Sequence, residues 1–247
     1  MIIRGVKIED SVKKTRIEAA WSGQAECRGC GIRDLALFAD LKEQDFSLIH
    51  LPIDEIAYEA GAVLYNSGDD GRAVYTVRSG LIKLVQYLPD GAQRIVRLLR
   101  PGDTLGLEVL VGDTYEHTAV VLRRALTCRI PREVVQRLSV ETPRLHSQLM
   151  KRWHQSVRQA DEWLTELSTG SARARVARLL LSQAEGANDQ ACELFSREDV
   201  GAMLGVTTET ASRMIAEFRR SGVLTDLEAN RYRCNIEELR RISGETA

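Results

Sequence analysis

Hydrophobic and polar positions alternate in short runs between residues 45 and 131. Runs bounded by glycine, proline, asparagine or aspartate are typical of β-strands joined by tight turns. The pattern predicts strands that include residues 73–77, 81–87 and 93–99. It predicts turns at residues 66–69, 79–80, 89–91 and 101–103. Strands at this spacing indicate a small β-barrel or sandwich.

A second pattern begins after Pro131, where apolar residues recur at intervals of three and four. It predicts one long amphipathic helix over residues 143–167, which Gly170 ends. The apolar stripe of this helix comprises Leu145, Leu149, Trp153, Val157, Ala160 and Leu167. A helix of this length packs either against its own domain or against a copy of itself.

Two short helices joined by a tight turn are predicted near the C-terminus, over residues 196–224. Ser196 and Asp199 have the spacing of a capping box, so the first helix begins there. Gly205 ends this helix, because glycine adopts a left-handed backbone conformation at little cost. Thr207 is the expected N-cap of the second helix.

The second helix of this pair has two different faces. We expect an inward face made of Ala211, Met214, Ile215 and Phe218. Glu209, Ser212 and Arg213 share another face, since residues three and four apart are neighbours on a helix. Arginine makes bidentate contacts with guanine, glutamate accepts from cytosine N4, and serine contacts bases or phosphates. The layout is that of a helix that enters a DNA major groove, and the alternative is an ordinary helical hairpin with a solvated polar face.

The charge of the chain is consistent with local rather than global attraction to DNA. The formal net charge is −1, while residues 171–178 and 213–220 are locally basic. Arg219 and Arg220 lie where they could hold phosphates. A short β-hairpin follows the helices, and its acidic Asp226 and Glu228 argue against a main phosphate contact there. A DNA site with two half-sites requires two recognition helices. This favours pairing of the long helix with the same helix of a second protomer.

Several classes of protein are disfavoured by the sequence. No catalytic motif with a GxSxG, Walker A or HExxH pattern is present, so we do not expect an enzyme. No apolar run of about 18 residues occurs, so we expect no membrane span and a cytoplasmic protein. The chain has five cysteines, an odd number that argues against a disulfide framework. Cys192 and Cys234 are expected to be structural.

A β-roll, a long helix and a winged helix-turn-helix in this order resemble the Crp/Fnr family of regulators. The landmarks are residues 68–69, 74–80, 90–91, 100–103 and 105–106 together with the helix-turn-helix. The resemblance implies an α+β fold with four parts: residues 1–44 as an N-terminal extension with a cysteine loop, 45–142 as the β-roll sensor, 143–169 as the dimerisation helix, and 170–247 as the DNA-binding domain.

Cyclic AMP is not the expected effector. The cyclic-nucleotide binders of this family carry a Gly-Glu pair and, a little later, an Arg-Ser or Arg-Thr pair. Here Gly106 is followed by Leu107, and the later pair is His117-Thr118. The arginine that would form charge-assisted hydrogen bonds to the cyclic phosphate is therefore absent.

The cysteines resemble those of the oxygen-sensing Fnr-type branch, which holds a [4Fe-4S] cluster. By that resemblance the ligands are Cys27, Cys30 and Cys128. Fnr-type loops carry another cysteine where this chain has Ala36 or Phe38. A carboxylate, either Asp34, which is preferred, or Asp40 or Glu26, would complete the usual four ligands. A thiol switch, haem at His117, another cluster or another small effector are the alternatives.

The same resemblance implies how the DNA-binding part works. Glu209, Ser212 and Arg213 match the Fnr-type pattern, and Thr208 and Arg219 complete the predicted DNA-contacting set. The expected operator is double-stranded DNA with a palindrome similar to TTGAT-N4-ATCAA, bound by a homodimer. RNA polymerase is an expected partner.

Overall fold

The computed structural model describes residues 37–46, 48–49, 51–184, 191–228 and 230–244. The chain divides into two compact units. One comprises the residues up to 84 together with 98–156, and the other comprises 85–97 together with the residues from 157 onward. Within the described ranges, no helix is long and apolar enough to cross a membrane.

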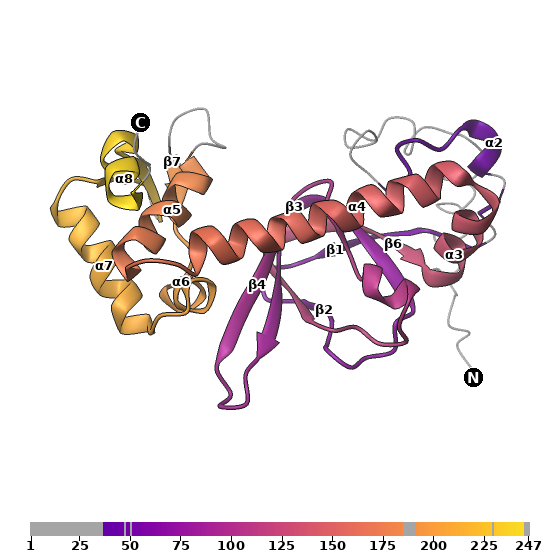
Figure 1. Cartoon of the computed structure of the whole chain (residues 1–247), viewed down its shortest axis with the longest axis horizontal. Helices are drawn as coiled ribbons and strands as arrows, with labels where there is room; N and C mark the ends of the chain where they lie inside the picture. The colour runs from indigo at the N-terminus through magenta and orange to yellow at the C-terminus, as the bar shows by residue number, and fades with distance from the viewer. Residues whose placement is uncertain (1–36, 47, 50, 185–190, 229, 245–247) are drawn as a thin grey trace, which may run out of the picture. The chain divides into compact units, whose positions relative to one another are not determined.

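A six-stranded sheet forms most of the N-terminal half of the chain, with strand order β1-β6-β3-β4 (Figure 1). β2 also pairs with β6, and β5 pairs with β3. The bounds are β1 Asp54–Tyr58, β2 Val63–Tyr65, β3 Ala73–Tyr87, β4 Gln93–Leu99, β5 Thr104–Leu105 and β6 Thr118–Pro131. The sheet confirms that this part of the chain is built of β-strands, as the hydrophobic pattern predicts, and its core contains the fully buried Val74, Val77, Ile82 and Val85.

The predicted turn at residues 79–80 is wrong, because β3 runs unbroken from Ala73 to Tyr87. Gly80 lies within this strand at a φ of 86°. A Cβ atom on Gly80 would lie 2.2 Å from the carbonyl oxygen of Arg124 in β6. The glycine therefore permits close approach of two backbones rather than a change of chain direction.

Three tyrosine rings form a cluster, and one of them, Tyr115, lies beside Gly106. The rings of Tyr65 and Tyr115 stack with centroids 3.8 Å apart, and Tyr75 lies 5.8 Å from Tyr65. The hydroxyl of Tyr115 donates to the carbonyl of Ala73 at 2.7 Å, and burial raises the pKa of this phenol. A Cβ atom on Gly106 would lie 3.1 Å from the ring of Tyr115.

Helices follow and flank the sheet: α2 Glu43–Phe46, the 3₁₀-helix η2 Leu107–Leu110, α3 Arg132–Glu141 and α4 Pro143–Glu162. Asp45 of α2 is held by Arg144 of α4, whose Nη2 donates to both carboxylate oxygens at 2.7 Å. This guanidinium lowers the pKa of the Asp45 carboxyl. The ion pair therefore fixes the start of α4 against α2.

The C-terminal part is a helical domain with a small sheet. The π-helix η3 Trp163–Leu167 continues directly from α4. The remaining helices are α5 Ala172–Ala184, α6 Arg197–Leu204, α7 Thr208–Arg220 and α8 Ile236–Ser243. A three-stranded sheet of order β7-β9-β8 combines β7 Ala191–Glu193, β8 Leu224–Glu228 and β9 Arg231–Cys234 (Figure 1). The α+β fold class predicted from the sequence is confirmed.

Candidate nucleic-acid interface

The caps of α6 and α7 are those that the sequence predicts. The hydroxyl of Ser196 accepts a hydrogen bond from the backbone N–H of Asp199 at 3.0 Å. Gly205 ends α6 in the left-handed conformation, with a φ of 63°. The hydroxyl of Thr207 accepts from the N–H of Thr210 at 3.2 Å, so α7 begins directly after it. These caps satisfy N–H groups that would otherwise lack a partner at each helix start.

Gly201 fixes the turn between the two helices, a role that the sequence analysis missed. A Cβ atom on Gly201 would lie 2.7 Å from the carbonyl oxygen of Val206, closer than side-chain atoms approach in proteins. The N–H of Val206 donates to the carbonyl of Gly201 at 3.1 Å. The close packing of the turn between α6 and α7 therefore requires a residue without a side chain at this position.

The inward face of α7 is largely as predicted. Ala211, Ile215 and Phe218 are at most 1% exposed, and Met214 is half-buried. These side chains repeat at intervals of three and four, so one stripe of the helix is covered by the domain core. The opposite stripe is consequently presented to solvent.

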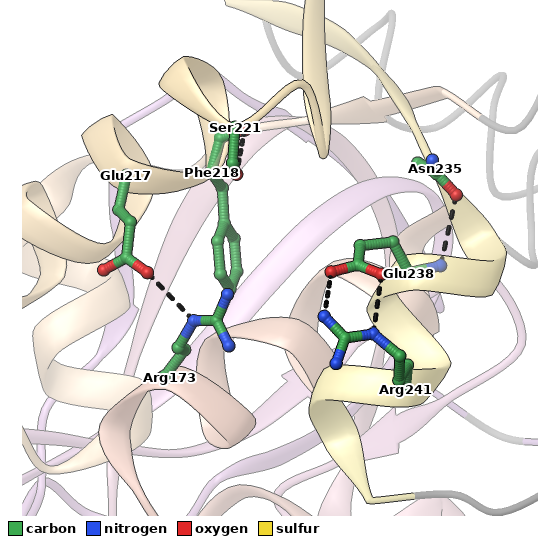
Figure 2. A network of polar contacts seen from close by, with 7 residues as sticks. All are labelled: Arg173, Glu217, Phe218, Ser221, Asn235, Glu238 and Arg241. Atoms are coloured by element: carbon green, nitrogen blue, oxygen red, sulfur yellow. Dashed lines mark hydrogen bonds and ion pairs between the residues drawn. The ribbon is translucent and has the colours of Figure 1, made fainter.

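Arg173 of α5 contacts the C-terminal half of α7, as Figure 2 shows. Its Nε donates to the carboxylate of Glu217 at 3.0 Å. Its guanidinium also lies over the ring of Phe218, 5.6 Å from the centroid, which is cation–π geometry. Both contacts reach consecutive residues of α7, so they fix the position and rotation of the helix relative to α5.

A second polar network in the same view stabilises α8. The side-chain oxygen of Asn235 accepts from the N–H of Glu238 at 3.1 Å and caps the helix (Figure 2). Arg241 donates from Nε to Glu238 at 2.8 Å and lowers the pKa of that carboxyl. α5 packs against α8 as well as α7, so the helix that carries Arg173 is fixed on both sides.

The outer face of α7 presents Thr208, Glu209 and Arg213 to solvent, with Ser212 half-buried beside them. The backbone N–H of Glu209 and the hydroxyl of Thr207 lower the pKa of the Glu209 carboxyl. Glu209 is therefore an ionised acceptor at the first turn of the helix. Among the described residues, none forms an ion pair with Arg213. This face offers one strong acceptor and one unneutralised guanidinium, the groups that contact cytosine N4 and guanine.

Arg219 has a partner within the protein. Its Nη2 forms an ion pair with Asp226 of β8 at 2.9 Å, and the carboxylate raises the pKa of this guanidinium. The guanidinium also lies 5.7 Å from the ring centroid of Tyr232. The predicted phosphate contact of Arg219 stays a prediction, and DNA would have to compete with Asp226 for it.

Two arginines of the locally basic segment 171–178 also have internal roles. Arg175 donates to the carbonyl of Leu204 at the C-terminus of α6. Arg178 donates to the carbonyls of Glu166 and Thr169, the latter at 2.9 Å, where the helix η3 ends. Cations at helix C-termini are favourable, because unpaired carbonyls concentrate negative charge there. Arg175 and Arg178 therefore have hydrogen-bond partners within the protein.

Comparison with known proteins identifies the family. Residues 55–141 match the model of the cyclic nucleotide-binding domain, and residues 174–242 match the Crp-like helix-turn-helix domain. Transcriptional activator protein anr of Pseudomonas aeruginosa is 30% identical over 213 residues, which cover 82% of this chain and 86% of that protein. The chain belongs to the Crp/Fnr family.

Other Crp/Fnr proteins extend the match over most of the chain. An anaerobic regulatory protein of Aggregatibacter actinomycetemcomitans is 28% identical over 225 residues, which cover 88% of each protein. The structure of FixK2 from Bradyrhizobium japonicum superposes with a TM-score of 0.71 at 25% identity, and covers 80% of this chain and all of that one. Regulators of this family bind DNA and are not enzymes, so the expected absence of enzymatic function agrees with the family.

Only one of the cysteines assigned by resemblance to an Fnr-type cluster lies in the described part of this Crp/Fnr chain. Cys128 lies in β6 opposite Glu55 of β1, and its side chain is half-buried. Cys27, Cys30 and the candidate fourth ligand Asp34 lie outside the described residues. The described residues contain no group of three or more histidine, cysteine, aspartate or glutamate side chains that could hold a metal ion.

The long helix distributes its apolar residues differently from the prediction. Leu145, Leu149 and Leu167 are at most 8% exposed, so the protomer itself already covers them. Val157 is 50% exposed, Ala160 is exposed and Trp153 is half-buried. Met150 and Leu164, which the sequence analysis left out of the stripe, are 52% and 63% exposed. The uncovered apolar positions are therefore Met150, Trp153, Val157, Ala160 and Leu164.

Proposed function

We propose that this Crp/Fnr protein is a homodimeric regulator that binds a TTGAT-N4-ATCAA-like palindrome through α7 and responds to oxygen or redox state. The observation that carries the DNA part is the outer face of α7. Glu209 is ionised there and Arg213 has no ion-pair partner among the described residues, while Arg173 and the buried stripe hold the helix in place. Thr208 and Ser212 complete the face, and RNA polymerase is the proposed protein partner.

The proposed dimer interface follows the uncovered stripe of α4 and η3. Met150, Trp153, Val157, Ala160 and Leu164 are spaced by three, four, three and four residues. This is the heptad spacing of two paired helices, in which such residues pack into the partner. A pair of protomers would also supply the two recognition helices that a palindrome requires.

Substituting Val157 with glutamate is expected to weaken the dimer by at least about 100-fold, because an unpaired charge would be buried at the centre of the stripe. Sedimentation velocity over a concentration series measures the change. Gln155→Glu is the matched control, since it adds the same charge at an exposed position off the stripe. An unchanged dimer in Val157→Glu would exclude this interface.

The proposed sensor uses Cys27, Cys30 and Cys128. Three thiolates are one ligand short of the usual set for a [4Fe-4S] cluster, and the carboxylate of Asp34 is the proposed fourth ligand. A cluster bound there would supply a centre that oxygen oxidises. Relatives named as anaerobic regulatory proteins support this assignment, and Cys128 is half-buried rather than enclosed in the core.

The β-roll supports an effector other than a cyclic nucleotide. Leu107, which stands where the nucleotide binders carry glutamate, is 6% exposed and belongs to the core. The ring of Tyr115 lies beside Gly106 and stacks on the ring of Tyr65. A thiol switch at the same cysteines, or haem at the half-buried His117, is the alternative.

Protein purified without oxygen is expected to contain iron and acid-labile sulfide and to show a broad brown absorption that bleaches in air. Operator affinity should change with the bleaching. Cys128→Ser should lower the iron content, whereas Cys192→Ala, which changes a cysteine outside the proposed ligand set, should not. Iron-free protein whose DNA binding responds to peroxide and recovers with dithiothreitol would support the thiol switch instead, provided that Cys128→Ser abolishes the response. Iron-free protein that ignores air and peroxide would exclude both.

A further inference from the structure

Two cysteines far apart in the sequence meet in the small C-terminal sheet. Cys192 lies in β7 and Cys234 in β9, and the side chains are 42 positions apart in the chain. Cys192 is the register partner of Tyr232, so Cys234, two residues further along β9, points to the same face of the sheet. The Sγ atom of Cys234 donates to that of Cys192 at 3.1 Å. Both side chains are 2% exposed.

The close contact of the two sulfur atoms affects the ionisation of both thiols. When Cys234 ionises, its sulfur accepts a hydrogen bond from the Cys192 thiol, and this stabilisation of the thiolate lowers the pKa of Cys234. The same hydrogen bond, together with burial, raises the pKa of Cys192. One sulfur of the pair is therefore suited to act as a nucleophile and the other to retain its proton until the first bond has formed.

We propose that Cys192 and Cys234 form a reversible disulfide, which makes this pair a redox modification site separate from Cys27, Cys30 and Cys128. The sulfur atoms need to approach by only about 1 Å to reach the length of a disulfide bond. β7 has three residues and, among the described strands, pairs with β9 alone, so local opening of this edge strand gives an oxidant access.

A low-molecular-weight disulfide such as oxidised glutathione is the oxidant. The Cys234 thiolate attacks one glutathione sulfur, and the glutathione disulfide bond breaks to release one glutathione thiolate. Cys192 then loses its proton to that thiolate and attacks the Cys234 sulfur, which releases the second glutathione thiolate. The thiolate takes up the proton that Cys234 gave to solvent. Two protein thiols are oxidised by two electrons, and one glutathione disulfide is reduced to two thiols.

The bond would enclose the DNA-contacting elements within one covalent loop. The chain between Cys192 and Cys234 contains α6, α7 and β8. A link between the ends of such a loop restricts the unfolded chain and stabilises the folded domain. The midpoint of thermal unfolding of this domain is expected to rise by roughly 10 °C on oxidation.

Equilibration of the full-length protein in glutathione redox buffers tests the proposal. After acid quenching, unfolding and alkylation, trypsin releases Cys192 in residues 179–197 and Cys234 in residues 234–240. The expected product is these two peptides linked, two hydrogen atoms lighter than their sum, and separated by dithiothreitol. The linked peptide needs no variant, so the test does not depend on how Cys192→Ser or Cys234→Ser folds.

Two results would overturn the proposal. One is that both cysteines remain alkylatable after prolonged exposure to oxidised glutathione alone. The other is that each cysteine carries glutathione and no linked peptide forms. Disulfide bonds that involve Cys27, Cys30 or Cys128 give linked peptides of other masses. The test of the Cys192–Cys234 disulfide is therefore independent of the proposed sensor.

Discussion

Arg213→Ala is expected to weaken binding to the proposed operator by about 1–3 kcal/mol per half-site, or roughly 5- to 150-fold for each. The side chain is exposed at the second turn of α7 and has no ion-pair partner among the described residues, so a guanine is its proposed partner. Fluorescence anisotropy with labelled duplexes at one fixed salt concentration measures the affinity. Duplexes with each base pair of the half-site replaced should show that the preference is lost at one position.

Arg220→Ala is the matched control for this experiment. It removes the same charge from an exposed position at the far end of the same helix. A phosphate contact carries no sequence information, so its loss should weaken operator and random DNA equally. The base-contacting role of Arg213 is wrong if Arg213→Ala behaves like this control.

Phe218→Ala is expected to lower the free energy of unfolding of the C-terminal domain by about 3–5 kcal/mol. The ring is fully buried in α7, and its removal would leave a cavity and expose the buried side of the Arg173 guanidinium. Urea unfolding monitored by circular dichroism measures the change. DNA binding should fall together with stability, because the same ring holds the DNA-contacting helix in place.

Glu217→Ala separates the packing of Phe218 from the neighbouring ion pair. The Arg173 and Glu217 side chains are 39% and 38% exposed, so solvent screens their attraction. Removal of this ion pair should lower the free energy of unfolding by no more than about 1 kcal/mol. A similar small loss in Phe218→Ala would mean that the domain core does not depend on the ring.

The sequence predicted the features that depend on neighbouring residues. Ser196, Gly205 and Thr207 act as caps through atoms within about one turn of the chain, so local spacing was sufficient. The strand pattern failed at Gly80, where a glycine typical of turns serves close contact with Arg124 of another strand. Local sequence carries no information about which backbone lies opposite.

Features that depend on distant partners could not be predicted. The amphipathic pattern of the long helix does not distinguish Leu145, which its own protomer covers, from Leu164, which is exposed. The number of charged residues did not reveal that Arg173 pairs with Glu217, which lies 44 positions further along the chain. The contact of Cys192 with Cys234 likewise depends on the pairing of β7 with β9.

If Arg219 contacts a phosphate as proposed, its ion pair with Asp226 would change how DNA binding depends on salt. Each lysine or arginine that neutralises a phosphate releases condensed counter-ions, and the salt dependence of affinity reports their number. An arginine that exchanges an internal carboxylate for a phosphate leaves that carboxylate to recruit cations from solution. Cation uptake by Asp226 would then offset part of the release from DNA. The affinity of this protein should therefore be less sensitive to ionic strength than its number of arginines would indicate.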